Sequence, residues 1–493
     1  MDAECEISST AFVLLCLDDH DTPELVELAR IFCGRVVRDR TWAGDAAAAV
    51  VFVCGDLARC PRLPRAVAVE RLSHGEAGFP LNTVPIGCAP ISVHGVGVLF
   101  RQFFLGPGAP TALAAAAPGG LFAAVTAAHE FQELTESNKA GVAFRRGVYL
   151  SDVVPNEGEG GERELAFNLL RCSSNLSGPT QGFEAVDRAI LAAVNDAARN
   201  AFGGGAAPIN HVLAQIYLNT AAAGEESGAP PPPCDTVPCE EDETTGAAPP
   251  GEAADGQDAA TAAADAASLE AAARAVALHS SGGKERKAAI KAHSDKTKDM
   301  PASGAIAFCS FYEAFEDGAF RGPHARLCHP AADPFDYCVG ESFRGGASAL
   351  TSLHFRLKRD VRDDAGRFAR EFSVTLYPDS LLLIPLSTNR RYTHEIRPSS
   401  LPVPYLPTRL GYVARCSKTR ALHSAARGTR VVSARDGLPR VLVPGSAADL
   451  RSLRSLYFAE NTSCDAVRYG DAHGDVFFSM NGGDFLAPML ARS

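Results

Sequence analysis

The stretch SLLLIPLSTNRRYTHEI, residues 380–396, contains two strand patterns in succession, over 380–386 and 391–396. Both are short runs rich in apolar residues and bounded by turn residues, which is typical of strands. Six further runs of the same kind lie at 211–218, 287–292, 304–312, 349–357, 371–377 and 409–416. Eight strands separated by turn residues favour a double-sheet jelly roll, a fold whose mouth commonly holds a functional site.

One helix is expected to brace this sheet. In FEAVDRAILAAVNDAARNAF, residues 183–202, the apolar side chains at 186, 190, 191, 194 and 198 fall along one stripe. Such a stripe is typical of a helix that packs on a sheet.

The chain of 493 residues is two to three times as long as a usual domain, so more than one folded unit is expected. Short apolar runs at 11–17 and 48–54 flank a stretch with helical spacing at 23–37. We therefore predict an α+β protein with four parts: an N-terminal α/β domain of unassigned role over 1–130, a jelly-roll core over 134–220 and 284–422, a disordered acidic insertion over 221–283, and a C-terminal extension over 423–493.

The acidic insertion accounts for the net charge of the whole chain, which is −11. Residues 221–283 contain twelve acidic residues and one base, Arg274, so the rest of the chain is formally neutral. This segment has almost no large apolar side chain and cannot bury enough surface to offset the entropy of ordering, which predicts disorder.

The 14 cysteines are scattered without a regular framework, and no secretory signal pattern opens the chain. Reduced thiols in the cytoplasm or the nucleus are therefore expected. No stretch approaches the roughly 18 apolar residues that span a bilayer, so no membrane contact is predicted.

The segment KAAIKAHSDKTKDMP, residues 287–301, contains two candidate metal ligands, His293 and Asp295, two positions apart. Residues i and i+2 of a strand point to the same face, so an imidazole and a carboxylate can converge there. With the distant His394, they form the composition of a two-histidine, one-carboxylate site, which leaves three positions of an octahedral Fe(II) open. The alternative is that His293 and Asp295 are solvent-exposed polar residues at a strand end.

Two further strands carry polar residues that could bind a ligand beside this metal. Arg409 and Arg415 lie six apart in RLGYVAR, on one face of a strand, where a guanidinium can clamp a dicarboxylate. Gln215 and Tyr217 are again i and i+2 on the strand that precedes His293 once the insertion is removed.

Together these residues resemble the Fe(II)- and 2-oxoglutarate-dependent dioxygenases, specifically their AlkB-like branch. That branch has an Asn-x-Tyr strand, then His-x-Asp, a distant His and an Arg-x-Asn-x-Thr-x-Arg strand; the corresponding pieces here are QIY at 215–217, HSD at 293–295, THE at 393–395 and RLGYVAR at 409–415. The surrounding sequence is similar to a subgroup found in algae, protists and large viruses. The resemblance covers 134–422 without the insertion.

The resemblance implies that His293, Asp295 and His394 bind Fe(II), that 2-oxoglutarate and O2 occupy the open positions, and that a substrate C–H bond is oxidised. It implies that Arg409 holds the remote carboxylate of 2-oxoglutarate, with Arg415 near the keto-acid end. Gln215, Gly411 and Val413 depart from the family pattern, which weakens an assignment to nucleic-acid repair.

The substrate is left open between two classes. KERKAAIKAHSDKTK, residues 284–298, carries six bases, and Arg390 and Arg391 flank His394, which favours a phosphate backbone and a modified nucleobase as substrate. The tyrosines 312, 377 and 392 could stack a base, and Lys296, Lys298 and Asp299 could face the substrate. The alternatives are a protein side-chain hydroxylase or demethylase, and a non-catalytic interaction scaffold. Cys328, His329 and Cys338 are interpreted as part of a surface loop rather than a second metal site.

Overall fold

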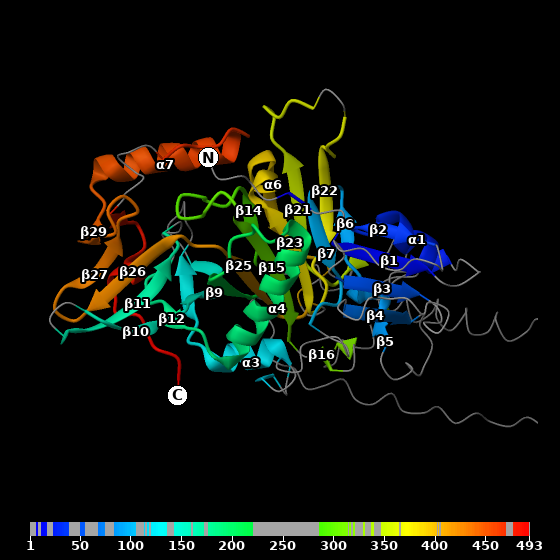
Figure 1. Cartoon of the computed structure of the whole chain (residues 1–493), viewed down its shortest axis with the longest axis horizontal. Coiled ribbons are helices and arrows are strands. Elements are labelled where there is room, and N and C mark those ends of the chain that lie inside the picture. The colour runs from blue at the N-terminus through cyan, green and yellow to red at the C-terminus, as the bar shows by residue number, and fades with distance from the viewer. Residues whose placement is uncertain are drawn as a thin grey trace, which may run out of the picture.

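The computed structural model describes residues 6–492 with gaps, of which the longest are 39–49, 55–67, 74–82, 105–112, 220–284 and 321–328. The acidic insertion predicted over 221–283 and Cys328 lie outside the described residues. The described part is an α+β protein with many strands and few helices, as predicted (Figure 1).

The largest sheet has nine strands and runs through the middle of the molecule (Figure 1). Its order is β12 (Gln181–Gly182), β9 (Val142–Ser151), β13 (His211–Tyr217), β25 (Arg409–Arg415), β15 (Ala305–Tyr312), β23 (Ser380–Pro385), β7 (Gly97–Phe100) and β6 (Ile91–Val93), with β8 (Gln132–Thr135) paired to β9. Every residue of β15, β23 and β25 is buried, so both faces of these strands are covered.

A second sheet has four antiparallel strands in the order β14 (Ile290–His293), β24 (Tyr392–Arg397), β21 (Ser352–Leu357) and β22 (Glu371–Thr375). Burial alternates along β24 and β22, because one face of this sheet packs inward and the other meets solvent.

All eight strands predicted from the sequence are present, within a few residues of their expected bounds. If these eight strands are numbered 1 to 8 along the chain, strands 1, 8, 3 and 6 are neighbours in the nine-stranded sheet, as β13, β25, β15 and β23. Strands 2, 7, 4 and 5 form the four-stranded sheet, as β14, β24, β21 and β22. Most connections between consecutive members therefore cross from one sheet to the other.

Helix α4 (Ala185–Phe202) confirms the helix predicted over 183–202. It begins with a capping box in which Glu184 and Asp187 exchange hydrogen bonds with the first-turn backbone. Its apolar stripe, including Val186, Ile190 and Val194, is buried in the main core with the strands of the large sheet. The helix therefore covers one face of that sheet.

The N-terminal region has its own parallel sheet, in the order β2 (Arg35–Val37), β1 (Phe12–Cys16), β3 (Val50–Cys54), β4 (Ala68–Ser73) and β5 (Thr83–Pro85), with helix α1 (Pro23–Ile31) beside it. The chain then enters the large sheet, because β7 pairs with β23 in an antiparallel register. The large sheet thus recruits residues from before the expected boundary at residue 130.

The region after residue 422 is also joined to earlier strands. A five-stranded sheet has the order β10 (Val154–Glu157), β11 (Arg163–Leu169), β26 (Thr419–Ser424), β27 (Gly428–Val432) and β28 (Pro439–Val441). Helix α7 (Ala447–Thr462) follows and crosses one end of the molecule (Figure 1).

The remaining elements are short: helices α3 (Leu121–Ala128) and α6 (Leu386–Arg391), 3-10 turns η2 (Ile86–Cys88) and η6 (Gly482–Phe485), and strands β16 (Phe315–Glu316), β17 (Ala319–Phe320), β18 (His329–Pro330), β19 (Tyr337–Val339), β20 (Ala347–Ser348), β29 (Val443–Pro444) and β30 (Phe478–Ser479). No helix in the described part of the chain has the length and apolar character needed to cross a bilayer.

Candidate metal centre

His293 and His394 face each other across two neighbouring strands. His293 is the last residue of β14, and its partner in the antiparallel register with β24 is His394. The two ring centroids are 4.6 Å apart. Because directly opposed residues of a strand pair project to the same face, the pairing of β14 with β24 brings both imidazoles together.

Asp295 completes the cluster from the loop after β14. Its Oδ1 lies 3.6 Å from His293 Nε2 and 3.9 Å from His394 Nε2, and the three ligand atoms lie within 4.8 Å of one another. The sequence argument placed His293 and Asp295 on one strand, but β14 ends at His293. The loop conformation, rather than strand alternation, aims the carboxylate at the imidazoles.

The three side chains differ in exposure, which gives the cluster an open side. Asp295 is 6% exposed and His394 is 3% exposed, whereas one third of the His293 side chain reaches solvent. A metal held here would therefore be reached from the His293 side.

Hydrogen bonding selects the tautomer of His293. Its Nδ1 lies 2.8 Å from the carbonyl oxygen of Lys291, and a carbonyl can only accept, so Nδ1 carries the hydrogen. The lone pair is then on Nε2, the nitrogen nearest Asp295. A backbone carbonyl that orients an imidazole in this way is common at metal-binding histidines.

The protonation states also suit a cation. Burial, with His293 close by, lowers the pKa of His394 to about 3, so its ring is neutral and can donate a lone pair. Burial alone would raise the pKa of Asp295, but the guanidinium of Arg415 is the main opposing charge, and that pKa lies well below its ordinary value. The cluster thus offers two imidazoles and one carboxylate, a donor set that fits Fe(II) or a similar divalent ion.

Arg415 contacts one of the three candidate metal ligands directly. Its Nε donates to Asp295 Oδ2 at 2.7 Å, and both side chains are almost fully buried. His211, which lies opposite Arg415 in the β13–β25 register, was missed in the sequence analysis. Burial and the nearby guanidinium lower the pKa of His211 to about 3, so it is a neutral neighbour of this ion pair.

Arg409 occupies the other end of β25 and is 2% exposed. Its Nε and Nη2 donate to Ser310 Oγ at 3.3 and 3.1 Å, and its guanidinium lies 4.8 Å from the centre of the Tyr217 ring. Nη1 is buried without a hydrogen-bond partner among the described residues. A buried cationic donor of this kind fits an anionic ligand, which would satisfy it.

The absence of a side chain at Gly411 makes room for this arrangement. A Cβ built there would lie 3.0 Å from the Tyr217 ring and 3.2 to 3.3 Å from the two terminal nitrogens of Arg409. The guanidinium of Arg409 is therefore folded back over Gly411, along β25 toward the end that carries Arg415.

Gln215 and Tyr217 lie where the sequence placed them, on one face of β13 beside Arg409. Tyr217 donates its hydroxyl to Gln215 Oε1 at 3.4 Å, and Arg145 Nη1 donates to the same oxygen at 3.5 Å. Arg145 and Ser310 were not predicted. The signal for Ser310 was a single polar residue inside the apolar run AIAFCSFY.

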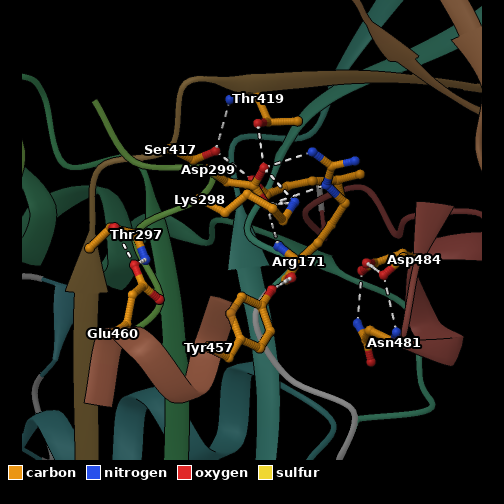
Figure 2. Close-up of polar contacts among 12 residues, drawn as sticks. Arg171, Thr297, Lys298, Asp299, Ser417, Thr419, Tyr457, Glu460, Asn481 and Asp484 are labelled. Atoms are coloured by element: carbon orange, nitrogen blue, oxygen red, sulfur yellow. Dashed lines mark hydrogen bonds and ion pairs between the residues drawn. The ribbon is translucent and has the colours of Figure 1, made fainter. Parts of the chain in front are cut away.

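Several other predicted residues lie elsewhere. Lys298 and Asp299 are buried in an ion cluster with Arg171, in which Asp299 also accepts from Thr419 (Figure 2). Burial would raise the pKa of Asp299, but Arg171 and Lys298 outweigh it and lower that pKa, so the carboxyl is charged. Both side chains are therefore engaged in this buried cluster.

The tyrosines at 312, 377 and 392 are all buried. Tyr312 and Tyr392 donate their hydroxyls to the carbonyl oxygens of Leu376 and Ala369, so both are core residues with a polar anchor. His329 and Cys338 are opposed residues of the β18–β19 pair.

A scan against protein-family models finds no family that matches this chain, and a search of curated proteins finds no match either. The function is therefore inferred from the geometry of the site.

Proposed function

We propose that the protein is an Fe(II)- and 2-oxoglutarate-dependent dioxygenase, with the AlkB-like branch as its nearest type. One observation carries the proposal: two imidazoles and one carboxylate, from β14, β24 and the loop between β14 and β15, converge within 4.8 Å. A two-histidine, one-carboxylate face leaves adjacent coordination positions open, which is the arrangement used by non-haem Fe(II) oxygenases.

The strand order supports a jelly roll as the scaffold of this enzyme. Eight antiparallel strands whose order is 1-8-3-6 in one sheet and 2-7-4-5 in the other are expected when a double-sheet roll closes on itself. In such a roll the second and seventh strands are neighbours, so His293 and His394 meet at one end. The eighth strand carries Arg409 and Arg415 along the facing sheet.

His293 Nε2, His394 Nε2 and Asp295 Oδ1 would hold the iron. When bound, Fe(II) supplies the oxygen chemistry that couples decarboxylation of 2-oxoglutarate to oxidation of a substrate C–H bond. The protein supplies placement: Lys291 orients the imidazole of His293, and Arg415 orients the carboxylate of Asp295.

Arg409 would bind the remote carboxylate of 2-oxoglutarate through Nη1, the buried donor that lacks a partner among the described residues. The guanidinium packs on the ring of Tyr217, and the absence of a side chain at Gly411 leaves room for it. Gln215, in place of the family's asparagine, is held by Tyr217 and Arg145 beside the same space.

A basic groove at the edge of the four-stranded sheet favours a nucleic-acid substrate with a modified nucleobase. The groove has a volume of about 760 Å³ and is lined by Arg356, Arg359 and Arg370, with Asp363 and Glu371 as its acidic residues. It lies where β21 leaves the small sheet, since Leu357 is opposite Tyr392, two residues before His394. Arg391 stacks on Phe368 in the groove wall at 5.0 Å. Cations beside an aromatic ring suit a phosphate backbone and its bases.

Release of succinate from 2-oxoglutarate tests this function. The purified protein, with Fe(II) and ascorbate, is offered a panel of methylated oligonucleotides and an array of peptides. We expect turnover with oligonucleotides, and none after Asp295→Ala. Turnover with peptides alone would assign a protein side-chain hydroxylase or demethylase, and Fe(II) binding that is unchanged in Asp295→Ala would reject the enzyme and favour a non-catalytic scaffold.

Binding of 2-oxoglutarate is tested separately by calorimetry with Mn(II) in place of Fe(II). Arg409→Leu should weaken 2-oxoglutarate by about 2–5 kcal/mol, as expected when one partner of a buried charge pair is truncated. Arg145→Leu, which removes a nearby cation of equal charge, should have a much smaller effect. Equal losses in both variants would mean that Arg409 is not the specific clamp.

A further inference from the structure

The loop that carries Asp295 depends on side chains for its shape. Residues 294–299 lie between β14 and β15, outside both strands, so their buried amides need partners from other parts of the chain. Asn389 holds Asp295 from one side: its Oδ1 accepts the Asp295 amide at 2.8 Å, and its Nδ2 donates to the Asp295 carbonyl at 2.9 Å.

The other side of this loop is held by helix α7, more than 150 positions away in the sequence. Asn461 Oδ1 accepts the amide of Ser294 at 2.8 Å and the amine of Lys296 at 2.7 Å. The same amine donates to the carbonyl of Tyr457 at 3.0 Å. The residues immediately before and after Asp295 are thus both fixed by α7.

Glu460, the neighbour of Asn461, extends the contact. Its Oε1 accepts the amide of Thr297 at 3.0 Å and the hydroxyl of Thr297 at 2.5 Å. Figure 2 shows Glu460 pointing from the helix toward Thr297, and Tyr457 pointing from the same helix toward Arg171. Glu460 is 7% exposed and Ser294 is fully buried, so water cannot readily replace these bonds.

Helix α7 is itself fastened to the protein at both ends of this contact. Tyr457 donates its hydroxyl to the carbonyl of Arg171 at 2.9 Å. Lys358, at the end of β21, donates its amine to the carbonyls of Glu460 and Ser463 at 2.5 and 3.0 Å, which caps the C-terminus of the helix. The loop that carries Asp295 is therefore bonded to a helix whose own position is fixed.

We propose that α7 supports the metal centre, and that Asn461 and Glu460 are positioning residues that orient the Asp295 carboxylate toward His293 and His394. This inference rests on the metal site of the proposed function, and it is independent of the substrate. Groups behind the ligands commonly change metal affinity by 10- to 100-fold. Here that role falls to a helix outside both sheets of the core, which bonds to the loop at Ser294, Lys296 and Thr297.

Titration of the full-length apo-protein with Co(II), followed by calorimetry and by the visible spectrum, tests the proposal. Asn461→Ala should weaken Co(II) at least tenfold and alter the ligand-field bands, because Asp295 is no longer aimed. Asn461→Asp keeps an acceptor oxygen for Ser294 and Lys296 and should restore both signals. Thr462→Val is the matched control on the same helix: it removes an exposed hydroxyl that bonds to the carbonyl of Phe458 within the helix, and it should leave Co(II) affinity within about twofold.

Hydrogen exchange supplies a second measurement. The amides of Ser294 and Thr297 should lose protection in Asn461→Ala and Glu460→Leu, respectively. If Asn461→Ala fails to fold, Thr297→Val replaces it, since it removes one hydroxyl of the same contact without a change of shape, and a weaker Co(II) site is again expected. Wild-type affinity and spectrum in a folded Asn461→Ala would overturn the role of α7 alone, whereas a wild-type protein that binds no Co(II) would overturn the metal centre itself.

Discussion

Arg415 donates its Nε–H to Asp295 Oδ2 at 2.7 Å, while the other oxygen of the same carboxylate faces the two imidazoles. The carboxylate of Asp295 thus contacts a permanent cation through one oxygen and the two imidazoles through the other. Arg415 keeps Asp295 charged despite its burial, and it also fixes which oxygen is available to a metal.

Replacing Arg415 should therefore make metal binding depend on pH. Without the guanidinium, burial would raise the pKa of Asp295, so Arg415→Met should lose Co(II) affinity as pH falls from about 7 to 5, where the wild-type protein retains it. The variant should also be less stable by about 3–5 kcal/mol, because a buried charge loses its partner. Calorimetry at several pH values measures the first effect, and a pH-independent variant would contradict it.

Stability of the metal-free protein should fall below neutral pH through two buried histidines. The folded pKa values of His211 and His394 are both about 3, against roughly 6.5 in an unfolded chain. Between these values the unfolded state takes up protons that the folded state does not, so the free energy of unfolding decreases as pH falls. Each histidine contributes up to about 1.4 kcal/mol per pH unit.

Urea unfolding between pH 5 and 7 measures this effect, and comparison of a histidine variant with the wild type separates it from the carboxyl of Asp379, whose pKa burial raises to about 7. His211→Gln should show about half of the histidine contribution to the slope while retaining His394. Parallel curves for wild type and variant would show that folding does not lower the pKa of His211.

Gly411→Ala should lower the affinity for 2-oxoglutarate at least tenfold without changing the affinity for Co(II). The added Cβ would press on Tyr217 and on the terminal nitrogens of Arg409, whereas His293, Asp295 and His394 are untouched. Val413→Ala, two residues along the same face, removes atoms instead of adding them and serves as the control. Calorimetry with each ligand separates the two effects, and an equal loss of both would indicate a general disturbance of β25.

Deletion of residues 225–281, with a short turn in their place, should leave Co(II) affinity unchanged, because loop length adds little to closure entropy. We expect the shortened protein to bind single-stranded oligonucleotides more tightly at low salt, since an acidic segment no longer competes with them, and similarly at high salt. Fluorescence anisotropy over a salt series checks this. Oligonucleotide binding that is absent in both forms at low salt would favour the protein-substrate alternative.

The strands could be predicted because each has a local pattern of its own. Runs such as AIAFCSFY in β15 are apolar along their whole length, since both faces of the large sheet are covered. Pairing leaves no such local trace, so neither the addition of β6 and β7 to the large sheet nor the joining of β26 to β11 was foreseen.

The three candidate metal ligands were predicted from their residue types and spacing, but the loop conformation that brings them together was not. Asp295 is aimed by Asn389 and Asn461 through hydrogen bonds to loop backbone, and an asparagine that makes such a bond looks in sequence like any other. Arg409 was predicted to clamp a ligand, whereas its contact with the Tyr217 ring and the space over Gly411 depend on the β13–β25 register.

The pairing of β7 with β23 sets a limit on how this protein can be shortened. A fragment that begins at residue 134, where the family resemblance starts, would lack β7 and expose the backbone N–H and C=O groups along one side of β23. That strand reads SLLLIP and is buried throughout, so the cut would create a flat apolar edge of the kind that recruits strands from other molecules. An isolated fragment of this kind should aggregate, and expression boundaries for the jelly-roll strands belong upstream of Ile91.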